Sequence, residues 1–146
     1  MIEPLRISQD VACSAEHAFA TWTERFGAWW PRGHTATGET GTQVVLEPRD
    51  GGRIYERTSD GREVEWGRIT AWEPPARLAY RWHIRRPAHE ATDVEIRFVP
   101  VAADASRIDI VHTGWERLGD EGPGWRDANT RGWGGLLPHF TAACAA

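Results

Sequence analysis

The sequence predicts an α+β fold in which a curved antiparallel sheet of about seven strands wraps around one long helix near the C-terminus. Three observations lead to this prediction. Segments of alternating apolar and polar residues recur along the chain, turn-forming Gly, Pro and Asp residues separate them, and residues 123–143 have helical periodicity instead. The 146 residues contain no repeat or linker, so we expect a single domain over residues 1–146.

The N-terminal segment predicts a strand followed by a short helix. Apolar and polar residues alternate over residues 5–11, which is typical of a strand with one buried face. Ser14 is a favourable helix N-cap, and apolar residues follow it at helical spacing as far as Phe26. The helix should end at Trp29-Trp30-Pro31, because the residue before a proline avoids the α-helical conformation.

Six further strands are predicted in the middle of the chain. They cover residues 43–47, 53–58, 63–72, 77–85, 92–101 and 106–113. The turns between them are short, so neighbouring strands should pair antiparallel. Within residues 63–72 the direction of the side chains stays open, because Trp66 and Trp72 have one parity and Ile69 the other. Outward-facing tryptophans here would offer a homodimer interface on the outer face of the sheet.

The terminal helix is predicted over residues 123–143, although it contains residues that disfavour a helix. Apolar residues recur at helical spacing from Trp125 to Phe140. Glycines at positions 132, 134 and 135 each cost about 1 kcal/mol relative to alanine, and Pro138 removes one backbone hydrogen bond. We therefore expect a bend there. A curved sheet around one helix commonly leaves space for a small ligand between them.

The composition excludes several classes of function. All 17 basic residues are arginines, so the chain has no lysine for a Schiff base, a pyridoxal phosphate anchor or a P-loop. The two cysteines, Cys13 and Cys144, provide neither a disulfide framework nor a thiolate zinc site. The six histidines show no metal-ligand spacing, so we expect no metal. No other cofactor is expected either.

Charge and hydropathy bear on partners and location. The net charge is −4 with both signs interspersed, which argues against nucleic-acid and membrane partners. Residues 1–10 do not resemble a signal peptide, and no apolar stretch approaches the roughly 18 residues of a membrane span. The sequence therefore predicts a cytoplasmic protein.

Two inward-facing polar residues are the candidate catalytic groups. Glu56 shares the inward face of its strand with Ile54, and His112 shares the inward face of its strand with Ile110. A carboxylate and an imidazole in one concavity could act as an acid/base pair. The alternative is structural: His112 as a hydrogen-bonded residue at a strand end, and Glu56 paired with an arginine.

The nine tryptophans suggest the walls of a ligand pocket. The expected pocket residues are Trp30, Glu56, Trp82, Phe98, His112, Trp115, Trp133 and Leu137. Large aromatic side chains are also typical of an ordinary core, so simple packing is the alternative.

Several motifs together resemble one known family. They include Trp29-Trp30-Pro31, Glu47-Pro48-Arg49-Asp50-Gly51-Gly52-Arg53, Trp66-Gly67-Arg68-Ile69, Trp72-Glu73-Pro74-Pro75 and His112-Thr113-Gly114-Trp115-Glu116. The chain is similar to the SRPBCC, or START-like, superfamily and, within it, to the bacterial Aha-type proteins, homologues of a heat-shock-protein ATPase activator. The resemblance implies a helix-grip fold with a hydrophobic pocket between the sheet and the terminal helix. The superfamily also includes lipid carriers, hormone receptors, polyketide cyclases and chaperone partners, so the fold does not determine the function.

Three functions remain open at this point. The first is binding of a small apolar or aromatic ligand without turnover. The second is a cofactor-independent enzyme resembling a polyketide cyclase, dehydratase or hydrolase, in which His112 and Glu56 transfer protons. The third is co-regulation of a chaperone ATPase in a stress response, although the sequence shows no exposed apolar helix face for such a partner.

Overall fold

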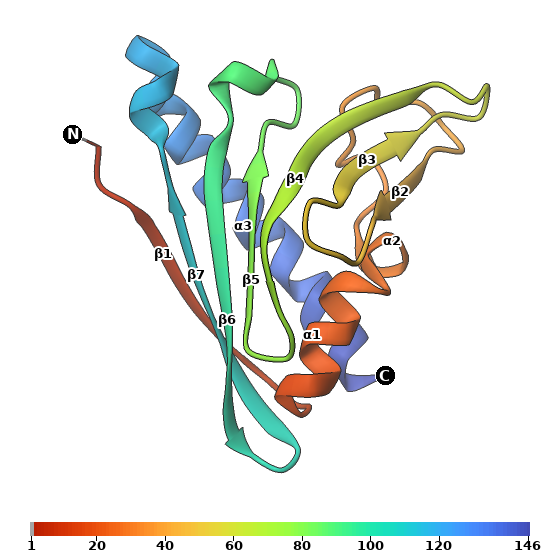
Figure 1. Ribbon diagram of the computed structural model, residues 1–146, viewed down its shortest axis with the longest axis vertical. Helices are drawn as coiled ribbons and strands as arrows, with labels where there is room; N and C mark the ends of the chain where they lie inside the picture. Colours follow the sequence, from red (N-terminus) through yellow and green to blue (C-terminus); the bar gives the residue numbers. More distant parts are fainter. Residues whose placement is uncertain (1) are drawn as a thin grey trace.

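A seven-stranded antiparallel sheet forms the body of the structure, a computed structural model that describes residues 2–146 and leaves Met1 outside. The spatial order of the strands is β1-β7-β6-β5-β4-β3-β2. Their bounds are β1 Leu5–Val11, β2 Gln43–Leu46, β3 Arg53–Arg57, β4 Glu63–Glu73, β5 Arg77–Trp82, β6 Thr92–Ala102 and β7 Ala105–Thr113. Figure 1 shows the strands curving across the molecule, with the terminal helix crossing diagonally behind them.

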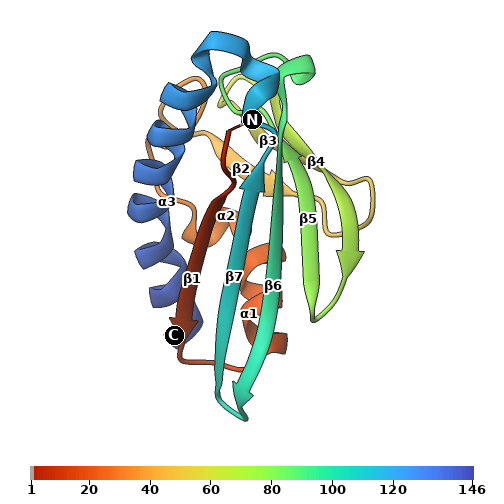
Figure 2. The ribbon, with the colours of Figure 1, turned by 90° about the vertical axis from the view of Figure 1, so that its left-hand side faces the viewer.

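The helices pack on the inner face of this sheet. They are α1 Ala15–Thr23, α2 Phe26–Trp29 and α3 Gly122–Ala145, with short 3₁₀ segments at Ala88–Glu90 and Trp115–Glu121. The helix α1 packs against β6, β7 and α3, while α2 packs against β2. Figure 2 shows α3 alongside β1 at the edge of the sheet. This confirms the predicted α+β helix-grip fold with a short helical segment after the first strand.

The predicted first helix is two helices in the structure. The Ser14 side chain caps α1 as expected, because its Oγ accepts a hydrogen bond of 3.1 Å from the His17 backbone N–H. The backbone leaves the helical conformation at Arg25, where φ is −106° and ψ is 19°. A Cβ on Gly27 would lie 2.3 Å from the Val44 carbonyl oxygen, so a glycine is needed where α2 meets β2.

Two β-bulges decide the direction of the side chains of β4, which the sequence left open. Each bulge adds one residue to β4, one opposite Ile54/Tyr55 and one between Ile69 and Ala71. An added residue moves the following side chains to the other face. Trp66 and Ile69 are therefore both buried, and Trp72 packs against the core at a ring distance of 5.1 Å from Phe19. The structure thus removes the basis for a homodimer interface built on outward-facing tryptophans.

The strand predicted over residues 77–85 ends earlier, at Trp82. A turn follows, closed by a hydrogen bond of 2.8 Å from the Arg86 backbone N–H to the His83 carbonyl. Arg85 in this turn has φ of +61°, a left-handed conformation that is unfavourable for a residue with a Cβ. The turn therefore removes Ile84 and Arg85 from the expected alternation.

The helix α3 continues without interruption through its glycines and Pro138 to Ala145, slightly beyond the predicted end. Its C-terminus brings together the two cysteines that lie far apart in the sequence. Cys13 and Cys144 are both buried free thiols and share a hydrogen bond, and burial raises the pKa of both. Among residues 2–146 no helix is long and apolar enough to cross a membrane.

Candidate functional site

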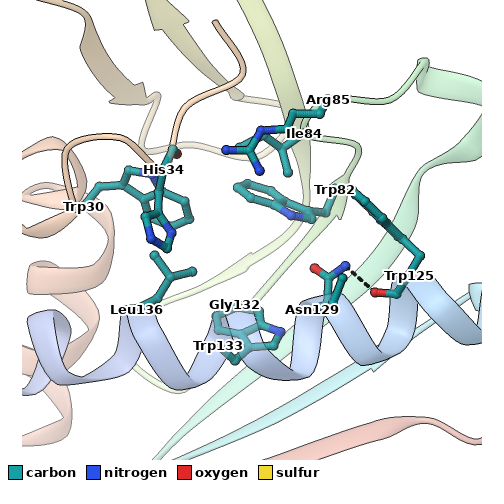
Figure 3. Close-up of a pocket in the computed structure, with 11 residues that line it drawn as sticks. Trp30, His34, Trp82, Ile84, Arg85, Trp125, Asn129, Gly132, Trp133 and Leu136 are labelled. Carbon is teal, nitrogen blue, oxygen red and sulfur yellow. Dashed lines mark hydrogen bonds between the residues drawn. The ribbon is translucent and has the colours of Figure 1, made fainter. Parts of the chain in front are cut away.

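A cavity of about 150 Å³ lies where α3 faces the end of β5 and the chain after α2. Four of its wall residues are tryptophans. The lining consists of Trp30, His34, Trp82, Ile84, Arg85, Trp125, Ala128, Asn129, Gly132, Trp133 and Leu136. Figure 3 shows these side chains converging on one space from three directions: the chain after α2, the end of β5 with its turn, and α3.

The indoles of the cavity are held by their neighbours. Trp30 follows the last residue of α2, and its Nε1 donates a hydrogen bond of 2.7 Å to the His34 carbonyl. Its ring centre lies 5.7 Å from that of Trp82, the last residue of β5. The guanidinium of Arg86 lies over the ring of Trp125, a residue of α3, with its central carbon 4.4 Å from the ring centre. The aromatic walls are therefore preorganised.

Glu56 lies outside the cavity and anchors the segment that covers it. The carboxylate is fully buried and accepts hydrogen bonds from Ala36 N at 2.5 Å, Thr37 Oγ1 at 2.7 Å and Trp66 Nε1 at 2.8 Å. Ala36 and Thr37 directly follow His34 and Thr35 in the chain. Glu56 therefore acts as a positioning residue for the loop that carries His34.

His112 lies behind the cavity and takes part in a chain of hydrogen bonds. Trp133 Nε1 donates to His112 Nδ1 at 3.1 Å, which leaves the ring proton on Nε2 to donate to Thr92 Oγ1 at 2.7 Å. Thr92 Oγ1 donates in turn to the Trp82 carbonyl at 3.2 Å. Burial lowers the pKa of His112 to about 3, so the imidazole is neutral at pH 7. These hydrogen bonds connect Trp133 with Trp82, two residues of the cavity wall.

The structure does not bring Glu56 and His112 together. They lie on β3 and β7, and the strands between them separate the two by about 19 Å along the sheet. Each group has its own set of hydrogen bonds, as described above. The acid/base pair expected from the inward-facing positions is therefore not formed, although both residues do face inward and are buried.

The predicted pocket residues divide into two groups. Trp30, Trp82 and Trp133 line the cavity. Phe98, Trp115 and Leu137 are buried in the core and do not contribute to the cavity lining. On α3 it is Leu136 that lines the cavity, together with Trp125, Asn129 and Gly132 from the helical face recognised in the sequence. His34 was missed because a loop has no periodicity from which side-chain direction follows. Ile84 and Arg85 were missed because they belong to a turn, whereas the sequence predicted a strand up to residue 85.

Two polar residues of the lining, His34 and Arg85, come from the loop after α2 and the turn after β5, whereas Asn129 lies on α3 (Figure 3). Arg85 donates through Nε at 3.1 Å and Nη2 at 2.9 Å to the Thr35 carbonyl. Burial lowers the pKa of His34, and the positive charges of Arg85 and His139 lower it further. Residues 2–146 contain no group of three His, Cys, Asp or Glu side chains placed to share a metal ion.

Comparisons with known proteins agree with this architecture. The family model described as Activator of Hsp90 ATPase homolog 1-like protein matches residues 12–145. Among solved structures, the anthrahydroquino-gamma-pyrone synthase Txn09 shares 31% sequence identity, with 97% of each chain covered and a TM-score of 0.63. No curated protein sequence matches the chain.

Two further structures extend the comparison. CalC, a self-sacrificing resistance protein from Micromonospora echinospora, shares 26% identity over 97% of this chain and 93% of its own, with a TM-score of 0.70. PFC0360w, an HSP90 activator from Plasmodium falciparum, shares 15% identity over 76% of this chain and 72% of its own, with a TM-score of 0.54, so that likeness concerns the fold alone. Since the family model spans nearly the whole sequence, the chain belongs to the Activator of Hsp90 ATPase homolog 1-like family of the SRPBCC superfamily.

Proposed function

We propose that this protein binds a small aromatic ligand in the cavity between α3 and the end of β5. The observation that carries the proposal is the cavity wall, in which four indoles surround a space next to a glycine of α3. A Cβ at Gly132 would meet no atom within 4 Å, so the helix leaves room at this point. Indole rings around an open space favour flat aromatic groups through stacking and edge contacts.

The size of the cavity limits what it can enclose. An apolar cavity of about 150 Å³ holds one benzene-sized ring. A larger aromatic ligand would place one ring between the indoles and extend past His34 and Arg85. The 31% identity to a synthase named for an anthrahydroquino-gamma-pyrone supports polycyclic aromatic compounds as the ligand class.

A pair of glycine variants tests the proposal. Gly132→Leu places a side chain in the cavity, whereas Gly134→Leu places the same side chain on an exposed position of the same helix. Neither added Cβ meets another atom within 4 Å, so the two variants should fold alike. The measurement is titration with neutral aromatic compounds, from 2-naphthamide to anthraquinone, followed by tryptophan fluorescence.

Saturable binding to wild type and to Gly134→Leu is expected, with an affinity at least about tenfold lower for Gly132→Leu. The proposal fails if no compound binds to the folded wild-type protein. It also fails if Gly132→Leu binds as tightly as Gly134→Leu, because the ligand would then lie elsewhere.

Turnover of an aromatic polyketide is a second candidate function, favoured by the identity to the synthase. Glu56 and His112 are poor candidates for the proton transfer, because their polar atoms already take part in internal hydrogen bonds. Mass spectrometry after incubation of the protein with anthraquinone and pyrone polyketides would detect a product. Compounds that bind to the protein but are recovered unchanged would favour the binding function over turnover. Co-regulation of a chaperone is supported only by the family name and a likeness of fold.

A further inference from the structure

The cavity lining contains a positively charged side chain and no negatively charged one. Arg85 is the only arginine in the lining, and no carboxylate is part of it. In residues 2–146, ten of the 17 arginines lie within 4.0 Å of an acidic group, among them the neighbouring Arg86, which pairs with both Glu90 and Glu121; Arg85 is one of the seven that do not. No such ion pair is formed by Arg85 within the described part of the chain. Its charge therefore has no neutralising partner beside the cavity.

The Arg85 guanidinium is directed over the cavity. Figure 3 shows the side chain reaching back from the turn after β5, so that the guanidinium lies between Trp82 and the segment of His34. Two of its donors bind the Thr35 carbonyl, through Nε and Nη2. A guanidinium has five N–H donors, so three remain, one on Nη2 and two on Nη1. These donors match the two oxygens of a carboxylate.

The backbone at this position is unfavourable in its own right. A left-handed conformation is unfavourable for a residue other than glycine, and Arg85 has φ of +61°. Such conformations persist where the surrounding structure enforces them, often at ligand sites. Here the turn after β5 brings the exposed Arg85 into the cavity lining.

We propose that the ligand is an aromatic acid, with its ring between the indoles and its carboxylate bound by Arg85. The inference rests on the proposed function and names the chemical class of the ligand. An aromatic cavity with one arginine and no carboxylate in its lining favours a flat apolar group that carries a negative charge. The simpler alternative is that Arg85 only ties the loop through Thr35.

A matched pair of ligands separates the two roles. 2-Naphthoate and 2-naphthamide have the same ring system and differ in charge, and their affinities are measured by isothermal titration calorimetry at low ionic strength. The proteins are wild type, Arg85→Gln, Arg85→Lys and Arg81→Gln. Arg81 lies on β5, four residues before Arg85 in the sequence, is exposed and is not part of the cavity, so its variant removes the same charge without changing the cavity lining.

Wild type and Arg81→Gln should bind naphthoate about tenfold more tightly than naphthamide, the size expected for one charged hydrogen-bonded pair. Arg85→Gln should lose this preference and keep its affinity for naphthamide. Arg85→Lys should keep part of the preference, because it retains the charge and loses the planar donor pair. Thermal unfolding of each variant verifies that it is folded, and the wild-type preference should decrease with added salt.

Three results would overturn the inference. Equal affinities of wild type for the two ligands would show that no cation recognises the acid, while the proposed binding of aromatic compounds would stand. An equal loss of both affinities in Arg85→Gln would show that the arginine only holds the loop. Absence of binding of either ligand to wild type would contradict the proposed function and the inference with it.

Discussion

At the scale of single residues, Glu56 and His112, both buried on the inner face of the sheet, have structural roles around the cavity. Glu56 gathers donors from the loop and from β4, and His112 connects Trp133 with the strand that ends at Trp82. Buried polar groups of this kind specify one arrangement of their neighbours when each hydrogen bond is made. The cavity walls therefore depend on residues that do not line the cavity.

Substitution of Glu56 should destabilise the protein strongly. Glu56→Gln replaces an acceptor oxygen with an amide NH₂, which would face backbone or indole donors and leave at least one of them unpaired. We expect a loss of about 2–4 kcal/mol in the free energy of unfolding, measured with urea.

Glu63→Gln is the matched control for this substitution. Glu63 is a partly exposed carboxylate that binds Arg53 and Arg57 at the surface. Its substitution should cost only about 0–1 kcal/mol. Equal losses in the two variants would contradict the anchoring role of Glu56.

At the scale of elements, packing stabilises α3 although its sequence contains residues that disfavour a helix. Pro138 lies in its interior, where it cannot donate a backbone hydrogen bond, yet the helix continues to Ala145. Phe140 and Cys144 beyond the proline are buried in the core. Burial of these side chains offsets the cost of the proline, so the helix does not end there.

Pro138→Ala should therefore stabilise the protein. The alanine restores the backbone donor, and Pro138 is exposed, so little packing is lost. We expect a gain of about 1–3 kcal/mol, measured by thermal or urea unfolding. Pro123→Ala is the control, because Pro123 is exposed in the first turn of α3, where no intrahelical donor is needed. A gain for Pro123→Ala as large as that for Pro138→Ala would refute this explanation.

At the scale of the whole molecule, the buried His112 should make stability depend on pH. Its pKa is lowered from 6.5 to about 3 in the folded protein, whereas the unfolded chain takes up the proton near pH 6.5. Below that pH the unfolded state binds more protons than the folded state. Stability is therefore fully present above pH 6.5 and is lost as the pH falls towards about 3.

The expected slope from this group is about 1.4 kcal/mol per pH unit. Urea unfolding at a series of pH values measures it, and His112→Asn removes the titrating group. Because the carboxylates of the chain contribute equally to both proteins, the difference between the two profiles isolates His112. Parallel profiles for wild type and His112→Asn would contradict the assignment of the lowered pKa.

Much of the fold follows from the sequence, because strand and helix periodicities are local. The alternation in β3 and β7 places Glu56 and His112 inward, and both are fully buried. Ser14 caps α1 as predicted, and the helical face of α3 includes most of the cavity residues from that helix. These features need only the spacing of side chains along one element.

The sequence by itself thus determined the order of the strands along the chain, the inward faces of the strands other than β4, and the family, while the cavity was decided by tertiary structure. The bulges in β4, the loop that carries His34 and the turn that carries Arg85 each depend on contacts between distant segments. The separation of Glu56 from His112 likewise depends on the strands that lie between them. A periodic pattern states which side of its own strand a residue occupies, but distances across a curved sheet exist only once the strands have paired.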